Sequence, residues 1–393
     1  MARVCLVRQH YVPKDTRVAR EVDALAALGH HVDVICLRDA GEPLFESGGN
    51  VSIWRVPLRH TRGRRVMRYL AEYGTFFAVT ACLLPLLHLR RRYRLIQVNA
   101  PPDVLVFASA LPRLFGARIL LDLQECFPEF FATKFGVPAH HPAVRLLSRL
   151  EQLSIRYANF AITPTRQMRA VFVARGADPG KIAVVMDGAD ERVFKASAVP
   201  PSLSHRSDEF RLISHGTIEP HYGLDTAVEA VALLHEEIPE LRLELYGDGS
   251  DVPRLRELAT EYGVQDRVRF TSRFVPLDEL VRAIAAADIG LVAINRDPFR
   301  DVALASKMLE FIAMRKPVIA SRTRSVEETF DPSCVEMFES GDAADLARAI
   351  RALHGDPERR ARMVEHAADV AKGYQWERQR HVYGAAVDRL LAA

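Results

Sequence analysis

Residues 305–320 read ASKMLEFIAMRKPVIA, a helical pattern that runs through a turn into a β-branched strand. At 100° per residue, Lys307 and Glu310 lie on one face of the predicted helix, and apolar side chains cover most of the other faces. A carboxylate in so apolar a helix is costly unless it is paired or meets a ligand. Two interpretations follow: a surface ion pair between Lys307 and Glu310, or a ligand site in which Glu310 binds sugar hydroxyls and Lys307 faces an anion.

The same alternation of strand and helix patterns runs through the rest of the chain. Strand patterns at residues 3–7, 31–36, 51–56, 95–98, 118–121, 160–163 and 182–185 alternate with helical patterns at 17–28, 66–91, 104–115, 143–157 and 166–174. After residue 209, strand patterns at 211–214, 242–246, 268–271, 289–292 and 317–320 alternate with helical patterns at 224–236, 252–262 and 277–286 and the helix quoted above, and a last helical pattern spans 376–391.

The two arrays are separated by residues 195–209, which are rich in proline and serine and predict a linker. The chain is therefore predicted to have an α/β fold of two Rossmann-like, doubly wound domains that face a cleft. The first domain is expected over residues 1–194 and the second over residues 210–374, with residues 375–393 forming a final helix. Ligands in such sheets bind at the carboxyl ends of the strands.

The composition is that of an ordinary globular protein long enough for two cores: 393 residues, 49% hydrophobic and 26% charged. A net charge of +3 argues against a nucleic-acid partner. The widely spaced cysteines show no metal-ligand spacing; they are Cys5, Cys36, Cys82, Cys126 and Cys334. Together with a chain that begins directly on a strand pattern, they predict a cytoplasmic protein without a signal peptide.

Residues 69–89 are almost continuously apolar and have arginines on both sides. These are Arg62, Arg64, Arg65 and Arg68 before the segment and Arg90, Arg91, Arg92 and Arg94 after it. The length would allow a membrane span, but Glu72, Gly74, Pro85 and His88 interrupt the segment. Three interpretations stay open: an ordinary domain helix, a helix whose basic rim touches an anionic membrane surface, and a true span.

Glycine-rich turns follow two strands of the second array, at residues 214–217 and 246–250. Small residues there would let backbone amides approach a phosphate, although both can also be ordinary turns. The second turn lacks the third glycine of the dinucleotide fingerprint and is weak evidence for a nicotinamide enzyme. Because the chain contains no Asp-x-Asp pair, we expect no dedicated metal on donor phosphates, and cations such as Lys307 would have to hold a diphosphate.

In the first array, Asp122 and Glu125 follow a strand pattern and could be acid–base groups, although a carboxylate at a strand end can simply cap a turn. His10 and His215 also lie at expected strand ends and are further candidates.

Stretches in this order resemble the retaining nucleotide-sugar glycosyltransferases of family 4, which have the GT-B fold of two facing Rossmann-like domains. They are residues 29–34, 121–125, 181–194, 216–223, 245–249 and 287–319. The resemblance implies that the final helix crosses back to the first domain and that Glu310 binds the nucleotide ribose. The variant Ser306-Lys307-x-x-Glu310 resembles a branch associated with surface polysaccharide assembly.

The chain departs from the family pattern at positions where the family carries polar residues. Val302 replaces the first motif glutamate, Thr217 and Tyr222 replace the phosphate-binding Arg and Lys, and Gln124 replaces a first-domain histidine. Lys307 thereby becomes the best remaining cation for a diphosphate, with help from Arg300. Arg17, which stands where the family has a glycine pair, is expected to approach the phosphate from the first domain.

The resemblance implies a metal-independent transferase that moves a sugar from a nucleoside diphosphate sugar to an acceptor hydroxyl with retention, in cell-surface polysaccharide or glycolipid assembly. Catalysis is expected at Lys307, Glu310 and Gln124, donor binding at Gly216, Thr217, Tyr222, Gly247, Asp248, Phe274, Arg300, Ser306, Lys307 and Glu310, and acceptor binding at Arg17, Asp122, Gln124 and Glu125. Expected partners are the donor, a carbohydrate or lipid-linked acceptor and an anionic membrane surface, with no cofactor beyond the co-substrate. Alternatives are a nucleotide-sugar epimerase of the same fold and a catalytically inactive partner subunit.

Overall fold

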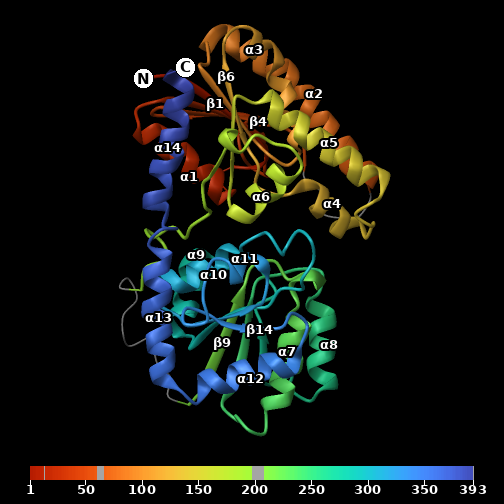
Figure 1. Cartoon of the computed structure of the whole chain (residues 1–393), viewed down its shortest axis with the longest axis vertical. Helices are drawn as coiled ribbons and strands as arrows, with labels where there is room; N and C mark the ends of the chain where they lie inside the picture. Colours follow the sequence, from red (N-terminus) through yellow and green to blue (C-terminus); the bar gives the residue numbers. More distant parts are fainter. Residues whose placement is uncertain (13, 60–65, 197–207, 393) are drawn as a thin grey trace. The chain divides into compact units, whose positions relative to one another are not determined.

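The computed structural model describes the chain except residues 13, 60–65, 197–207 and 393 (Figure 1). The chain divides into two compact units, which we call unit 1 (Met1–Met186 with Gln379–Ala393) and unit 2 (Asp187–Arg378). Each unit is built on a mainly parallel β-sheet with helices on its faces, so the predicted α/β class with two doubly wound domains is confirmed. Most of the predicted linker, residues 195–209, lies outside the described residues.

The sheet of unit 1 has the strand order β3-β4-β2-β1-β5-β6-β7-β8. Its strands are β1 (Arg3–Tyr11), β2 (His31–Leu37), β3 (Phe45–Gly48), β4 (Val51–Val56), β5 (Leu95–Asn99), β6 (Arg118–Asp122), β7 (Phe160–Thr163) and β8 (Ile182–Val184). Neighbours pair in parallel except β3, which forms an antiparallel hairpin with β4. Strand β3 escapes the sequence pattern because its residues are all exposed and show no apolar alternation.

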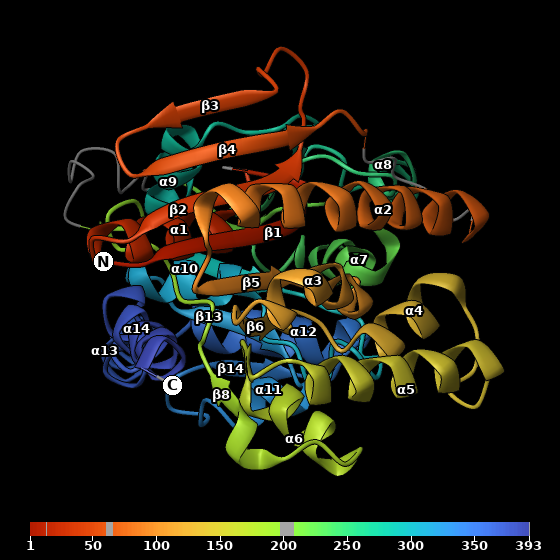
Figure 2. The same ribbon diagram turned by 90° about the horizontal axis from the view of Figure 1, so that it is seen from above.

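The helices of unit 1 cover both faces of this sheet. They are α1 (Thr16–Ala27), α2 (Val66–Arg91), α3 (Ala110–Leu114), α4 (Phe127–Phe135), α5 (Pro142–Tyr157) and α6 (Arg166–Ala174). Figure 2 shows α2, α3 and α5 on one face and α1 on the other. The helix predicted over residues 104–115 is instead a 3₁₀ helix, Asp103–Ser109, that continues into the short α3.

The aromatic segment after β6, which is not among the predicted helices, forms helix α4. Pro128 stands in its first turn with Glu129, where a fixed φ and a negative charge are both favourable. Gly136 ends the helix with a φ of +65°, a left-handed conformation that glycine adopts without strain. The rings of Phe131 and Phe135, four residues apart, pack at 4.6 Å between centroids, as helical spacing requires.

Helix α2 carries the apolar segment 69–89, while Arg62, Arg64 and Arg65 lie outside the described residues. Within the described residues it is the one helix, over Met67–Arg91, that is long and apolar enough to cross a membrane by length and composition. Only 22% of its most apolar window is buried. The side chains of Phe76, Leu84 and Leu87 are nonetheless buried, so one face of α2 packs against the rest of unit 1.

The last helix, α14 (Trp376–Ala392), lies mainly in unit 1. The fully buried Tyr383 donates a hydrogen bond to Gln97 Oε1 on β5 at 2.6 Å. Gln379 Oε1 accepts one from the amide of Met186 at 2.8 Å. The C-terminal helix therefore returns to the first unit, as the resemblance implies.

The division between the units lies earlier than predicted, at Met186 rather than residue 194. Ala189 and Phe194 are buried in the core of unit 2, so the segment after β8 already belongs to that unit. Unit 2 also runs to Arg378 rather than to residue 374. Its two ends pack closely, because a Cβ on Gly188 would lie 2.0 Å from the carbonyl oxygen of Tyr374.

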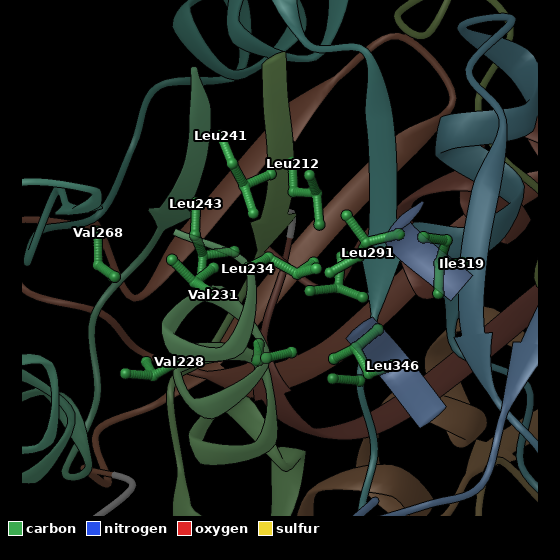
Figure 3. Close-up of a cluster of buried hydrophobic side chains, with 14 of the residues drawn as sticks. Leu212, Val228, Val231, Leu234, Leu241, Leu243, Val268, Leu291, Ile319 and Leu346 are labelled. Carbon is green, nitrogen blue, oxygen red and sulfur yellow. The ribbon is translucent and has the colours of Figure 1, made fainter. Parts of the chain in front are cut away.

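The sheet of unit 2 is parallel throughout and has the order β11-β10-β9-β12-β13-β14. Its strands are β9 (Phe210–His215), β10 (Leu241–Tyr246), β11 (Val268–Phe270), β12 (Ile289–Val292), β13 (Val318–Ser321) and β14 (Glu336–Phe338). Its helices are α7 (Leu224–Leu234), α8 (Val252–Glu261), α9 (Leu277–Ala286), α10 (Ser306–Ala313), α11 (Arg324–Glu327), α12 (Ala343–His354) and α13 (Pro357–Ala371). Figure 3 shows leucine and valine side chains of α7 against Leu212, Leu243 and Leu291 of the sheet.

Helix α10 is the helix predicted at residues 305–314, and its apolar side chains are buried as expected. Its position depends on Gly290 in β12. A Cβ on Gly290 would lie 2.4 Å from the ring of Phe311, so the glycine lets α10 pack directly on the strand. This close packing fixes Lys307 and Glu310 relative to the sheet.

Candidate active site

The polar side chains of α10 lie near the point where the strand order of unit 2 reverses. From β9 the sheet grows through β10 to β11 on one side, and from β12 through β13 to β14 on the other. Ligands of doubly wound sheets bind at the carboxyl ends of the strands beside such a switch point. His215 ends β9, and the loop that leads to α10 follows β12.

Glu310 meets His215 rather than Lys307. Glu310 Oε2 lies 3.1 Å from His215 Nε2, and the two side chains are 18% and 9% exposed. The histidine ring is itself fixed edge-on against Phe311, with 5.1 Å between the ring centroids. Among the described residues no ion pair joins Lys307 to Glu310, so the surface-pair interpretation of the two residues is wrong, and the ligand-site interpretation stays a prediction.

Lys307 places its ammonium group in a half-buried position beside the turn after β9. A Cβ on Gly216 would lie 3.8 Å from Lys307 Nζ. Burial lowers the pKa of Lys307 to about 8, and the negative charge of Glu310 only partly offsets this. No carboxylate of the described residues pairs with Lys307, so an anionic ligand would supply the missing counter-charge.

Tyr222 stands where the resemblance implies a lysine, and its ring holds two cations instead. Lys307 Nζ lies 5.0 Å from the ring centroid and the Arg300 guanidinium 5.6 Å from it. Such cation–π contacts fix the position of a charge without neutralising it. Arg300 also pairs with Asp297, so its charge is largely compensated. Lys307 is therefore the stronger anion-binding group of the two.

The glycines of the two turns let the turns pack against each other rather than leaving room for a ligand at the backbone. Gly216 has a φ of +111°, and its amide donates to the carbonyl oxygen of Tyr246 at 2.9 Å. A Cβ on Gly247 would lie 1.9 Å from the carbonyl oxygen of Gly216. The expectation that the amide of Gly216 binds phosphate is thus wrong, because this amide is already used. The turn between Tyr222 and α7 is held in the same way by Asn295, whose side chain donates to the carbonyl oxygen of Pro220.

The remaining predicted donor residues lie at the surface of this edge. Thr217, Asp248 and Ser306 are exposed, and the ring of Phe274 after β11 is 90% exposed. They are accessible to a ligand, and their roles stay predictions. Val302, at the position of the missing motif glutamate, is buried, and its side chain carries no polar atom.

The predicted acceptor residues of unit 1 belong to a buried network. Arg17 donates to both oxygens of Asp122 at 2.8 and 3.0 Å and to the carbonyl oxygen of Val185 at 3.1 Å. Asn99 Nδ2 donates to Asp122 Oδ2 at 2.9 Å. Because Arg17 and Asp122 are buried and bound to one another, the expectations of a phosphate contact for Arg17 and of acid–base chemistry for Asp122 are wrong.

Gln124 and Glu125 lie just beyond this network and are partly exposed. Gln124 Nε2 donates to Asp122 Oδ2 at 2.9 Å, which fixes the orientation of the amide. Glu125 contributes negative potential that raises the pKa of the buried Asp103, after burial itself and Glu151. Both residues remain candidates for acceptor binding.

Two contacts at this edge of the sheet do not follow from the sequence. His215 was noted only as a strand-end histidine, and its proximity to Glu310, 95 positions later, depends on the strand order. Tyr222 was read as the loss of a charge, whereas its ring positions the cations that remain. The one signal in the sequence is an aromatic residue at a position where the resemblance implies a lysine.

Sequence comparison matches both halves of the chain to families of the same kind. Residues 197–370 match the model "Glycosyl transferases group 1", and residues 15–188 match "Glycosyl transferase 4-like domain". The D-inositol 3-phosphate glycosyltransferase of Thermomonospora curvata is 29% identical over 269 residues, which are 64% of this chain and 59% of that protein. The chain spans 51–59% of the length of the first four curated relatives it matches.

Structural comparison shows the same fold over the full chain. Sucrose-phosphate synthase from Thermosynechococcus elongatus has a TM-score of 0.79 at 21% identity, with all of both chains covered. Anabaena Alr3699/HepE in complex with UDP-glucose has a TM-score of 0.74 at 16% identity, with 99% of this chain and 100% of that chain covered. These likenesses confirm the predicted GT-B architecture.

Proposed function

From the premise that the chain belongs to the family-4-like GT-B glycosyltransferases, we propose that it is a retaining transferase. It transfers a sugar from a nucleoside diphosphate sugar to an acceptor hydroxyl and retains the anomeric configuration. One observation carries the proposal. Glu310 and Lys307, whose ammonium group pairs with no carboxylate of the described residues, stand together at the switch point of unit 2, on a helix that packing holds in place.

In this proposal the two groups bind different parts of the donor. Glu310 accepts hydrogen bonds from the ribose hydroxyls, which a carboxylate binds more strongly than a neutral acceptor does. Lys307 binds the diphosphate, and Tyr222 keeps the ammonium group in position. Because the HepE structure contains UDP-glucose, UDP-sugars are the first donors to test.

The proposed chemistry requires no protein nucleophile and no metal ion. The bond between the anomeric carbon and the diphosphate oxygen breaks while the acceptor oxygen bonds to that carbon from the same face. The departing diphosphate oxygen takes the acceptor proton. Lys307 stabilises the negative charge that develops on this leaving group, the kind of stabilisation that dominates many enzymes.

Helix α2 supports a proposal for the location of the reaction. One face of α2 packs against unit 1, and most of the helix surface is exposed. These two features fit a helix that lies on a membrane surface better than one that crosses the bilayer. We therefore propose a cytoplasmic protein peripheral to the inner face of the membrane, with a carbohydrate or lipid-linked acceptor of cell-surface polysaccharide or glycolipid assembly.

Titration calorimetry with UDP tests the donor site. Replacing Glu310 by Ala should weaken UDP binding about ten-fold or more, because hydrogen bonds to a charged group contribute about 1.5–3 kcal/mol. Glu257→Ala, at an exposed carboxylate of α8 outside the predicted site, is the control and should change affinity far less. Equal affinity of the wild type and Glu310→Ala would remove the ribose assignment.

Product analysis separates the alternatives. Incubation with a UDP-sugar and an acceptor should give a glycoside whose anomeric coupling constant matches that of the donor, whereas an inverted product would contradict retention. Formation of an epimer from the donor alone would identify an epimerase. An absence of nucleotide binding by the wild type would indicate a catalytically inactive partner subunit.

A further inference from the structure

Two adjoining cavities open at the amino-terminal edge of the unit 1 sheet, the edge where β5 and β6 begin. The first, of ≈ 510 Å³, is lined by Arg94, Arg113 and Arg118. The second, of ≈ 370 Å³, is lined by Arg92 and Arg94 together with apolar side chains. They share Arg94 and Gly116, and no acidic side chain of the described residues lines either one.

The charges of three of these arginines have no carboxylate partner among the residues that the structure describes. Among the ion pairs of the described residues, none joins Arg92, Arg94 or Arg113 to an acid, whereas Arg91 pairs with Asp33 at 3.7 Å. The contacts of Arg94 and Arg113 are with neutral groups. Arg94 donates to the carbonyl oxygen of Leu391, and the Arg113 guanidinium stacks 4.2 Å from the ring centroid of Tyr157. Guanidinium groups held in this way form a site for a phosphate, which they bind with paired donors.

Large apolar side chains at the end of α2 and along α3 are exposed. We call them the amino-edge patch: Leu86, Leu89, Leu111, Leu114 and Phe115, which are 51–80% exposed. Leu89 and Phe115 line the same cavity as Arg92 and Arg94. The Phe115 ring also stacks near His88 of α2, so the ends of α2 and α3 form one surface. Exposed apolar residues around a cationic cavity match a ligand with both a phosphate and a hydrocarbon part.

The distribution of charge between the units supports an anionic surface as the partner. Unit 1 contains 28 Lys and Arg against 15 Asp and Glu, a net charge of +13. Unit 2 contains 25 Lys and Arg against 35 Asp and Glu, a net charge of −10. The net charge of the whole chain, +3, does not reveal this difference between the units. An anionic bilayer would attract unit 1 and repel unit 2, whereas two copies of unit 1 would repel each other.

We propose that the two amino-edge cavities bind the phosphate headgroup of an anionic phospholipid, with its acyl chains against the amino-edge patch. Arg94, which lines both cavities, holds the phosphate, and Arg92 and Arg113 flank it. Leu89, Leu114 and Phe115 enter the hydrocarbon boundary. This site specifies the membrane contact of the proposed function and rests on it, but it lies in the unit that does not contain the donor site.

Vesicle flotation with the full chain tests the site. Wild type should float with vesicles of phosphatidylcholine and phosphatidylglycerol and not with phosphatidylcholine alone. Arg94→Gln with Arg113→Gln should weaken binding about five-fold per arginine, since each basic residue at an anionic surface contributes roughly that factor. Leu114→Ser with Phe115→Ser should weaken binding on the same vesicles through loss of apolar burial.

A matched control removes the same charge elsewhere in unit 1. Arg145→Gln with Arg149→Gln replaces two exposed arginines in the first half of α5, and binding should fall by less than about three-fold because distant charges are screened. Equal losses in the two arginine pairs would overturn the site, as would unchanged flotation of the Arg94 and Arg113 variant. Binding of inorganic phosphate to the wild type without any vesicle binding would also overturn it.

Titration of the same variants with UDP separates this proposal from the proposed function. Loss of flotation with unchanged UDP affinity supports the lipid site. Failure of the wild type to bind UDP would remove the proposed donor site while the flotation result stands by itself.

Discussion

Both units carry a cluster of charged side chains at a switch point of their sheets, and the two clusters are built differently. In unit 1 the order reverses between β1 and β5, and Arg17, Asp122 and Asn99 there bind one another below the surface. In unit 2 the order reverses between β9 and β12, and Lys307 has no carboxylate partner among the described residues. The same topological position holds a closed structural network in one unit and an open site in the other.

The difference shows what a charged residue at a strand end can mean. Arg17 and Asp122 satisfy each other through two hydrogen bonds, so neither is available to a ligand. Glu21 completes that network: burial and the charge of Asp122 raise its pKa well above the usual range, and its Oε1 lies 3.6 Å from Arg17 Nε. Lys307 has its charge destabilised by burial and lacks such a partner. Only in unit 2 would a ligand be needed to compensate a charge, the one on Lys307.

The largest effect is expected from breaking the closed network. Asp122→Ala would leave the Arg17 guanidinium buried without its main partner, which should lower the unfolding free energy of unit 1 by about 3–5 kcal/mol. Denaturant unfolding with separate probes for each unit measures this loss. UDP affinity should stay unchanged in the fraction that folds. A stability close to the wild type would contradict the closed-network description.

A smaller effect, on chemistry rather than stability, is expected at the open site. Lys307→Met should lower turnover of a UDP-sugar about 100-fold, the magnitude typical for loss of one group that stabilises developing charge. Lys316→Met is the matched control, because Lys316 Nζ donates to the carbonyl oxygens of Ala285 and Ala287. Steady-state kinetics and thermal unfolding should show lost turnover for the first variant and lost stability for the second. The reverse pattern would assign Lys307 a structural role.

The smallest effect is expected at Glu21. Gln97 and Asn99 both donate to Glu21 Oε2, at 2.7 and 2.8 Å, and burial raises the pKa of this carboxyl, which favours its neutral form. Glu21→Gln retains a neutral acceptor of the same shape, so unfolding free energy should change by less than about 1 kcal/mol. A loss comparable to that of Asp122→Ala, measured under the same conditions, would show that Glu21 is charged in the folded protein.

Much of the fold could be predicted from the sequence, because strand and helix periodicity is a local property. Helix α10 and its buried apolar faces are examples. Strand β3 is not predicted because its exposed residues carry no apolar alternation. Helix α4 is not predicted although Phe127, Phe131 and Phe135 recur at helical spacing, because its 9 residues are too few to separate a helix from an apolar loop by periodicity.

The candidate site was less accessible, because its contacts join residues far apart in the chain. Arg17 was assigned to a ligand since its partner, Asp122, follows 105 positions later. Glu310 and Lys307 could be proposed because both lie on one predicted helix. Their environment, with His215 on β9 and the ring of Tyr222, depends on the strand order, which no local pattern contains.

The claim that Lys307 binds a diphosphate is tested most directly by proton uptake. With a pKa of about 8 in the free protein, Lys307 is half protonated at pH 8, and a bound diphosphate should raise that pKa. Binding of UDP at pH 8 should then take up about half a proton, and affinity should fall as pH rises above 8. Calorimetric titrations in buffers of different ionisation enthalpy measure the uptake. Uptake in the wild type that disappears in Lys307→Met would support the account, whereas a binding enthalpy independent of the buffer would contradict it.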